Sequence, residues 1–278
     1  MIMFSKILFP VDFSDRCEEA AHAVRAMAVR FQSEVTALRV VEVASANSEY
    51  ESLVARAREK MDQLVTRELR DCVVVPYFER GDPAQVILSY VRNGHFDLVM
   101  MPTHGYGPFR RFLLGSVTAK ILHDATCPVW TSTHLETSSA TRNVSIQRVL
   151  GAVDFGSRSS VVLQLASQIA EKFHARLTAA HAIPISSPFM EGYWIQNWRE
   201  EARKGVPQQL QKLLPCGSPP AEIEVLEGSP AGALSEAARR LNADLVVIGH
   251  SHASEADGKL GANAYAIITR SPCPVVSI

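Results

Sequence analysis

The second half of this chain repeats the first. Four landmark segments recur in one order, 142 to 147 residues later: Lys6–Phe13 as Arg148–Phe155, Gly81–Ala84 as Gly228–Ala231, Phe96–Val99 as Ala243–Val246, and Cys127–Val129 as Cys273–Val275. A period this long indicates duplication of a whole domain and excludes a solenoid of short repeats. The length of 278 residues also suits two domains of ordinary size. We therefore expect two copies of one domain, over residues 1–135 and 146–278, with a boundary near residue 140 in a Ser/Thr-rich linker.

Within each copy, short β-branched runs alternate with longer segments of helical periodicity. In the first copy we expect strands at 6–11, 34–43, 73–78, 98–101 and 129–132, and helices from Ser14, over 49–70, over 83–93 and over 116–124. The second copy follows the same order, with strands at 148–153, 175–182, 222–227, 245–249 and 274–278. This alternation predicts an α/β fold: two tandem doubly wound domains, each a five-stranded parallel sheet with helices on both faces. Ligands of such sheets bind beyond the carboxyl ends of the strands, where Asp12 and Gly105 should meet.

A Gly-rich turn follows the apolar strand at 98–101. Gly105 is followed, after nine residues, by Gly115-Ser116 at the start of a helix. The first N–H groups of that helix, from Ser116 to Thr118, have no partner within the helix and carry its partial positive charge. This turn and helix start therefore predict a phosphate-binding site.

Composition limits the classes of partner and the cellular location that we expect. A net charge of −1 gives no electrostatic reason to expect a nucleic acid or an acidic membrane as partner. No apolar run approaches the roughly 18 residues that a membrane span needs, and the N-terminus does not resemble a secretion signal. Five scattered cysteines without metal-ligand spacing indicate free, mostly buried thiols. We expect a cytoplasmic protein.

The motifs at 10–14, 81–83, 97–105 and 113–118 together resemble the universal stress protein family, and the resemblance covers nearly the whole chain as two tandem family domains. It implies a Rossmann-like fold of the adenine nucleotide alpha hydrolase type. It also implies that ATP, ADP or AMP binds the first copy, with Mg²⁺ bridging the phosphates. The residues implied to bind the nucleotide are Pro10, Val11, Asp12, Val40, Met101, Pro102, His104, Gly105, Gly115, Ser116, Val117 and Thr118.

The same resemblance implies how the two copies associate. Single-domain members of the family pair through their last strands, so the two copies are expected to form an internal pseudo-dimer. Association of two chains into a homodimer stays open.

The first copy departs from the family motif Gly-x2-Gly-x9-Gly-(Ser/Thr) at one position. Pro102 stands where the first glycine belongs, which removes an N–H donor and fixes the backbone φ. The two later glycines and the Ser-Val-Thr helix start remain, so we expect this site to hold nucleotide.

The second copy departs further. Its first glycine, Gly249, is kept, but His252 replaces the second, only eight residues separate His252 from Gly261, and Ala262 lacks the hydroxyl. Glu255 and Asp257 in that loop would repel phosphate. We expect this second site to be empty or to bind a ligand other than ATP.

Some of these residues admit a second interpretation. Asp12 and Asp154 follow the first strand of each copy and could serve only as turn or capping carboxylates. His104 could act in catalysis, although no Ser or Cys nucleophile accompanies it in a recognisable motif. Cys127 and Cys273 precede Pro at equivalent places, which packing explains better than redox chemistry.

Three further segments carry functional interpretations beside plain ones. His250 and His252, with Asp257, could bind a metal, but the two histidines lack a convincing third and fourth ligand. Arg110 and Arg111 could reach phosphate or simply face solvent. The aromatic stretch 188–198, with Trp194 and Trp198, is interpreted either as an interface or as a helix packed on its own domain.

Three functions compete on the sequence. The leading hypothesis is an ATP-binding stress or signalling protein that acts through nucleotide-dependent conformation or partner choice. The second is a nucleotide-free interaction scaffold of the same fold. The third is a slow ATP hydrolase, for which the sequence names no general base or water-positioning residue.

Overall fold

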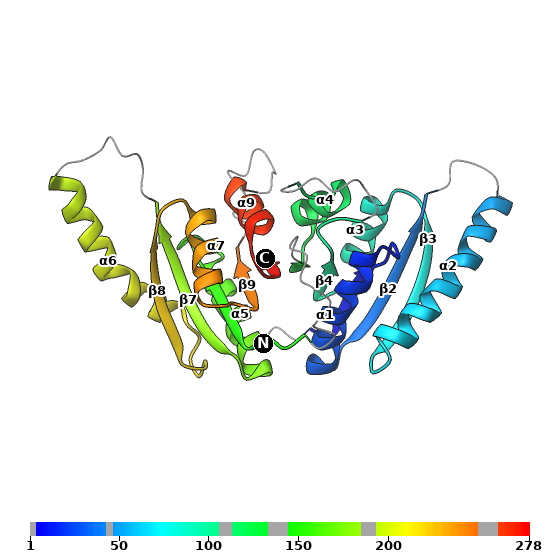
Figure 1. The fold of residues 1–278 in the computed structure, drawn as a ribbon, viewed down its shortest axis with the longest axis horizontal. Coiled ribbons are helices and arrows are strands. Elements are labelled where there is room, and N and C mark those ends of the chain that lie inside the picture. The colour runs from blue at the N-terminus through cyan, green and yellow to red at the C-terminus, as the bar shows by residue number, and fades with distance from the viewer. Residues whose placement is uncertain (1–3, 43–46, 106–112, 133–143, 185–192, 250–260) are drawn as a thin grey trace. The chain divides into compact units, whose positions relative to one another are not determined.

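The computed structural model describes residues 4–42, 47–105, 113–132, 144–184, 193–249 and 261–278; at 47–48 and 193–202 it describes the backbone alone. Contacts between Cα atoms divide the chain into two units, Met1–Ser145 and Ile146–Ile278. Each unit is described by itself below (Figure 1).

Unit 1 is built around a parallel sheet with the strand order β3-β2-β1-β4-β5. Helices α1 and α2 contact each other, as do α3 and α4, and the two pairs cover opposite faces of the sheet. The strand order reverses at β1, which pairs with β2 on one side and β4 on the other, so a crevice opens beyond the carboxyl ends of β1 and β4. The elements are β1 (Lys6–Pro10), α1 (Asp15–Phe31), β2 (Glu34–Val41), α2 (Asn47–Glu68), β3 (Val73–Arg80), α3 (Pro83–Gly94), β4 (Leu98–Met101), α4 (Ser116–Asp124) and β5 (Val129–Thr131).

Unit 2 repeats this topology with the order β8-β7-β6-β9-β10, again all parallel. The predicted fold, tandem doubly wound units with five-stranded parallel sheets, is confirmed. Helix and strand ends differ from the predicted ones by one or two residues. The elements are β6 (Arg148–Ala152), α5 (Ser159–Phe173), β7 (Arg176–Ile183), α6 (Tyr193–Leu213), β8 (Ala221–Glu227), α7 (Pro230–Arg240), β9 (Leu245–Ile248), α9 (Ala262–Arg270) and β10 (Val275–Ser277).

The central strands are apolar on both faces, as a covered parallel sheet requires. Ile7, Leu8 and Phe9 of β1 are fully buried, and Val149 and Leu150 occupy the same places in β6. The sheet of each unit therefore holds its strand ends in fixed positions.

A carboxylate joins the first and fourth strands of each unit at the edge opposite the crevice. Asp97 Oδ2 accepts hydrogen bonds from Ser5 N at 2.8 Å, Ser5 Oγ at 2.7 Å and Lys6 N at 2.9 Å. In unit 2, Asp244 Oδ2 accepts from Gln147 N at 2.8 Å and Arg148 N at 2.9 Å. This bond explains why the landmark at 96–99 recurs at 243–246, since an ionised acceptor makes strong bonds to backbone donors.

Candidate functional site

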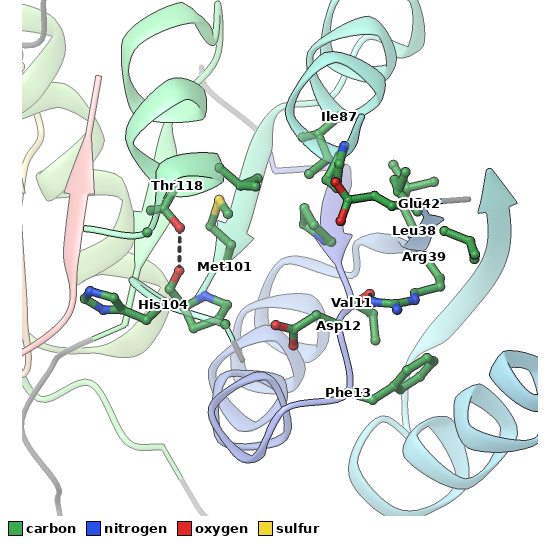
Figure 2. A pocket seen from close by; sticks show the side chains of 18 of the residues that line it. Val11, Asp12, Phe13, Leu38, Arg39, Glu42, Ile87, Met101, His104 and Thr118 are labelled. Atoms are coloured by element: carbon green, nitrogen blue, oxygen red, sulfur yellow. Dashed lines mark hydrogen bonds between the residues drawn. The ribbon is translucent and has the colours of Figure 1, made fainter. Parts of the chain in front are cut away.

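A cavity of about 910 Å³ opens at the carboxyl ends of β1, β2 and β4, and α2, α3 and the start of α4 complete its lining. Figure 2 shows side chains of residues that line it. The structure brings together all the residues that the sequence predicts for a nucleotide site. The cavity-lining residues among them are Pro10, Val11, Asp12, Val40, Met101, Pro102, His104, Gly105, Gly115, Ser116, Val117 and Thr118.

The start of α4 presents unused donors to this cavity. Its N-cap, Gly115, has no side chain to cap the helix, and the first turn closes with Ala119 N donating to Gly115 O at 2.8 Å. The amides of Ser116, Val117 and Thr118 meet no acceptor among the described residues. Three N–H groups at the positive end of a helix dipole are a site for an anion.

The turn before α4 is fastened through carbonyl groups. Thr118 Oγ1 donates to Pro102 O at 3.1 Å, and Gly115 N donates to Thr103 O at 2.9 Å. Proline keeps its carbonyl although it lacks an N–H. Pro102 therefore holds the helix start in place by the one backbone group that the substitution leaves intact.

Asp12 divides its two oxygens between the turn and the cavity. Its Oδ1 accepts from Ser14 N at 2.9 Å and from Ser14 Oγ at 2.7 Å, and Ser14 in turn caps α1 by accepting from Cys17 N at 3.2 Å. Asp12 is thus not itself the helix cap but orients the residue that is. The other oxygen, Oδ2, faces Gly105.

The two predicted glycines play different parts. A Cβ atom on Gly105 would lie 2.2 Å from Asp12 Oδ2, so any other residue there would displace that carboxylate oxygen. A Cβ atom on Gly115 would meet Thr103 O at 3.4 Å, an ordinary contact, and the φ of −59° at Gly115 suits any residue. The need for glycine at 105 is therefore a need for space beside Asp12.

His104 is a buried wall of the cavity, with 7% of its surface exposed. Burial lowers the pKa of His104 below its ordinary value, and the positive charge of Arg16 lowers it further. In Figure 2 the ring points away from the Asp12 carboxylate. The imidazole is thus neutral at neutral pH.

Sequence reasoning missed a set of charged and aromatic lining residues opposite α4. Arg39, on β2, donates from Nη1 to Val11 O at 3.3 Å, and the cavity is also lined by Phe13, Arg56 and Lys60. The sequence does contain a pattern that could have indicated two of them. Arg56 and Lys60 are four residues apart and so lie on one face of α2.

The remaining wall is apolar. Leu38 and Val40 of β2, Ile87 of α3 and Met101 of β4 line it, and each has 7% or less of its surface exposed. Such a wall suits a planar organic ring, while the amides of α4 suit an anion.

The lining offers little to a metal ion by itself. Asp12 and Glu42 are its two carboxylates, and the described residues contain no group of three or more His, Cys, Asp or Glu side chains placed to hold a metal. A Mg²⁺ ion fits here only with phosphate oxygens as most of its ligands.

Unit 2 has the same helix start and the same carboxylate after its first strand, but other side chains at the helix start. The N-cap of α9, Gly261, again lacks a side-chain bond, yet Ala262 and Ala264 replace Ser116 and Thr118. Asp154 Oδ1 accepts from Gly156 N at 2.8 Å and Ser159 Oγ at 3.3 Å, and Asp154 is exposed.

Several predicted features lie outside the described residues. They are Arg110, Arg111, His250, His252, Glu255, Asp257 and the side chains of Trp194 and Trp198.

The thiols are free, and most are unreactive. Burial raises the pKa of Cys17, Cys127 and Cys273 to about 12. At that value almost no thiolate forms at neutral pH, which favours the packing role expected for Cys127 and Cys273. Cys216 is exposed, Cys72 and Cys127 are half-buried, and Cys17 and Cys273 are buried.

Comparison with known proteins assigns the chain to a family. The family model described as "Universal stress protein family" matches residues 3–132 and again 145–278. The chain therefore belongs to the universal stress protein family and carries two of its domains in tandem.

Individual relatives agree with this assignment. "Universal stress protein MJ0577" of Methanocaldococcus jannaschii is 27% identical over 157 residues, which cover 46% of this chain and 94% of that protein. "Universal stress protein MJ0531" of the same organism is 32% identical over 138 residues, which cover 46% of this chain and 81% of that protein. The crystal structure of a universal stress protein from Archaeoglobus fulgidus is 20% identical and aligns with a TM-score of 0.69 over 98% of this chain and 95% of that one, so it shares the fold.

None of the helices in the described parts of the chain has the length and apolar character to cross a membrane.

Proposed function

We propose that unit 1 binds an adenine nucleotide and that the protein serves in a stress response or in signalling. The observation that carries this proposal is the uncapped start of α4, whose three unused amides line a cavity that also has an apolar wall. Phosphate groups bind the amides of Ser116, Val117 and Thr118, and the base lies against the apolar wall near Val40. Asp12 accepts a hydrogen bond from the ribose.

The ligand is ATP, ADP or AMP, and Mg²⁺ is held through the phosphates. Binding changes conformation or partner choice, because its free energy favours whichever state of the protein holds the ligand better. The domains over 1–135 and 146–278 form an internal pseudo-dimer in the cytoplasm, with nucleotide held mainly by the first.

A charge placed at the helix start tests the site. Ser116 is exposed at the first position of α4, where an acidic residue stabilises a helix through its dipole. Ser116→Asp should therefore fold well, yet it puts a negative charge where phosphate binds. Calorimetric titration with ATP, ADP and AMP should show affinity lost in Ser116→Asp. Ala262→Asp is the matched control at the first position of α9 and should bind like the wild type.

The outcomes separate the candidates. Equal ATP affinity in Ser116→Asp and wild type would reject the assigned site. A wild-type protein that binds none of the three nucleotides, and carries none on purification by mass spectrometry, would leave the scaffold hypothesis. Phosphate release above a heat-killed blank that disappears in Asp12→Ala would support a hydrolase.

A further inference from the structure

Three cations gather on the wall of the cavity opposite α4. Arg39 comes from β2, and Arg56 and Lys60 come from α2. Within the described parts of the chain, no carboxylate lies within salt-bridge distance of any of the three, whereas Arg25 and Arg240 each pair with a carboxylate elsewhere. We call Arg39, Arg56 and Lys60 the cationic wall.

Two members of the cationic wall converge on one aromatic ring. The Arg39 guanidinium carbon lies 5.5 Å from the centroid of the Phe13 ring, and Lys60 Nζ lies 5.8 Å from it. Phe13 holds this place with a left-handed backbone, at a φ of 63°, which is strained for a residue with a side chain. The ring face attracts both cations, but two like charges drawn to one ring repel each other unless an anion lies between them.

Unit 2 shows that this turn does not need the arginine charge. Phe155 repeats the left-handed backbone at a φ of 62°, and His181 occupies the place of Arg39. His181 Nδ1 makes the equivalent bond to Val153 O at 2.8 Å, and its ring packs against Phe155 with centroids 4.4 Å apart. A histidine therefore suffices for the bond and the packing, so the fixed charge of Arg39 serves something other than the fold.

The cationic wall is separate from the α4 amides. In Figure 2, Thr118 and Arg39 stand on opposite sides of the cavity, with Met101 and Val11 between them. A ligand phosphorylated at one position and bound to α4 would turn an uncharged part toward the cations. We propose that, besides ATP, ADP and AMP, this site binds a nucleotide phosphorylated at two separate positions, with one phosphate on the α4 amides and the second on the cationic wall. This inference rests on the proposed nucleotide site.

Comparing one phosphate with two tests the inference. The probes are AMP, adenosine 2′,5′-bisphosphate, adenosine 3′,5′-bisphosphate and ATP, each titrated at pH 8 into the full chain. Wild type should bind at least one bisphosphate roughly tenfold more tightly than AMP, because a phosphate in contact with Arg and Lys makes charge-assisted bonds. That preference should shrink as salt is raised.

Arg39→His reproduces the arrangement of unit 2, so it should fold, and it should remove most of the preference for bisphosphate over AMP. Lys60→Gln should remove a smaller part, because Lys60 is exposed and solvent screens it. The control is Arg58→Gln, which changes a cation of α2 that stacks on Phe78 at 4.9 Å and does not line the cavity. Its preference should match wild type.

Each other result has a distinct meaning. Equal affinity of wild type for AMP and both bisphosphates would overturn the inference and leave the proposed function standing. ATP binding that exceeds AMP binding and falls in Arg39→His, with no bisphosphate preference, would assign the cationic wall to the triphosphate tail and also overturn it. Failure of every nucleotide to bind would overturn the proposed function itself.

Discussion

The two units keep the same frame and differ in what lines their crevices. Both have the same strand order, a carboxylate joining the first and fourth strands, a left-handed Phe after the first strand, and an uncapped helix after the fourth. Ser116 and Arg39 of unit 1, however, give way to Ala262 and His181 in unit 2. The carboxylate that joins the first and fourth strands is thus present in both units. The hydroxyl of Ser116 and the fixed charge of Arg39 are present in unit 1 alone. This difference separates what the fold needs from what a ligand would need.

The largest effect should come from filling the space beside Asp12. Gly105→Val pushes a side chain into the Asp12 carboxylate, and overpacking of this kind should weaken nucleotide binding by roughly 10- to 100-fold. Gly115→Ala is the control, because its added carbon meets only ordinary contacts. Calorimetry with ATP measures both. Equal affinities in the two variants would show that the carboxylate plays no part in the site.

Neutralising the same carboxylate in each unit should give unequal results. Asp12→Asn keeps the shape but loses the charge that strengthens an accepted hydrogen bond, so ATP affinity should drop about tenfold. Asp154→Asn should leave ATP affinity unchanged if unit 1 holds the nucleotide. A loss in Asp154→Asn equal to that in Asp12→Asn would break the distinction between the units.

Acid should destabilise unit 1 through His104, whose place in unit 2 is taken by Ser251. Burial lowers the pKa of His104 below 6.5, so the unfolded chain binds a proton there at a higher pH than the folded protein does. The stability that neutral His104 contributes is complete above the unfolded pKa and is lost as pH falls through the folded pKa. Urea unfolding at pH 7.5 and pH 5.5 should show this loss in wild type and a smaller one in His104→Gln. An unchanged difference would refute the assignment.

The smallest effect concerns the thiols and leaves function untouched. Cys216 of unit 2 is exposed, whereas burial raises the pKa of Cys17, Cys72, Cys127 and Cys273. Native protein at pH 7.5 should therefore show one rapidly reacting thiol in a colorimetric thiol assay, and Cys216→Ser should abolish that phase. A rapid phase that survives in Cys216→Ser would mean that another cysteine, such as the half-buried Cys72, reacts quickly despite its raised pKa.

The internal repeat made most of the fold predictable. Strands and helices alternate with clear periodicity, and the cap at Ser14 and the Pro83 helix start carry strong local signals, so elements were located to within one or two residues. The helix start at Ser116 was likewise legible, because a glycine followed by a small polar residue after a buried strand has few structural uses.

The rest of the site depends on contacts between segments distant in sequence. Nothing near Gly105 in the sequence indicates that its missing side chain makes room for Asp12, since 92 residues separate them. Arg39 precedes Val40 in a strand whose other residues are mostly apolar, so the sequence indicates a core strand there. The contact of Arg39 with Phe13 depends on the left-handed backbone of Phe13, which no local sequence motif predicts. From the sequence, Pro102 only loses an N–H donor. Its carbonyl oxygen accepts a hydrogen bond from the Thr118 hydroxyl, which only the three-dimensional structure shows.

The bonds of Asp97 and Asp244 bear on how such a duplicated chain evolves. Each of these hydrogen bonds lies entirely within its own copy, between residues more than 90 positions apart in the sequence. A change in one crevice therefore leaves these bonds intact in both sheets, so one copy can change its ligand specificity while the other copy keeps its own.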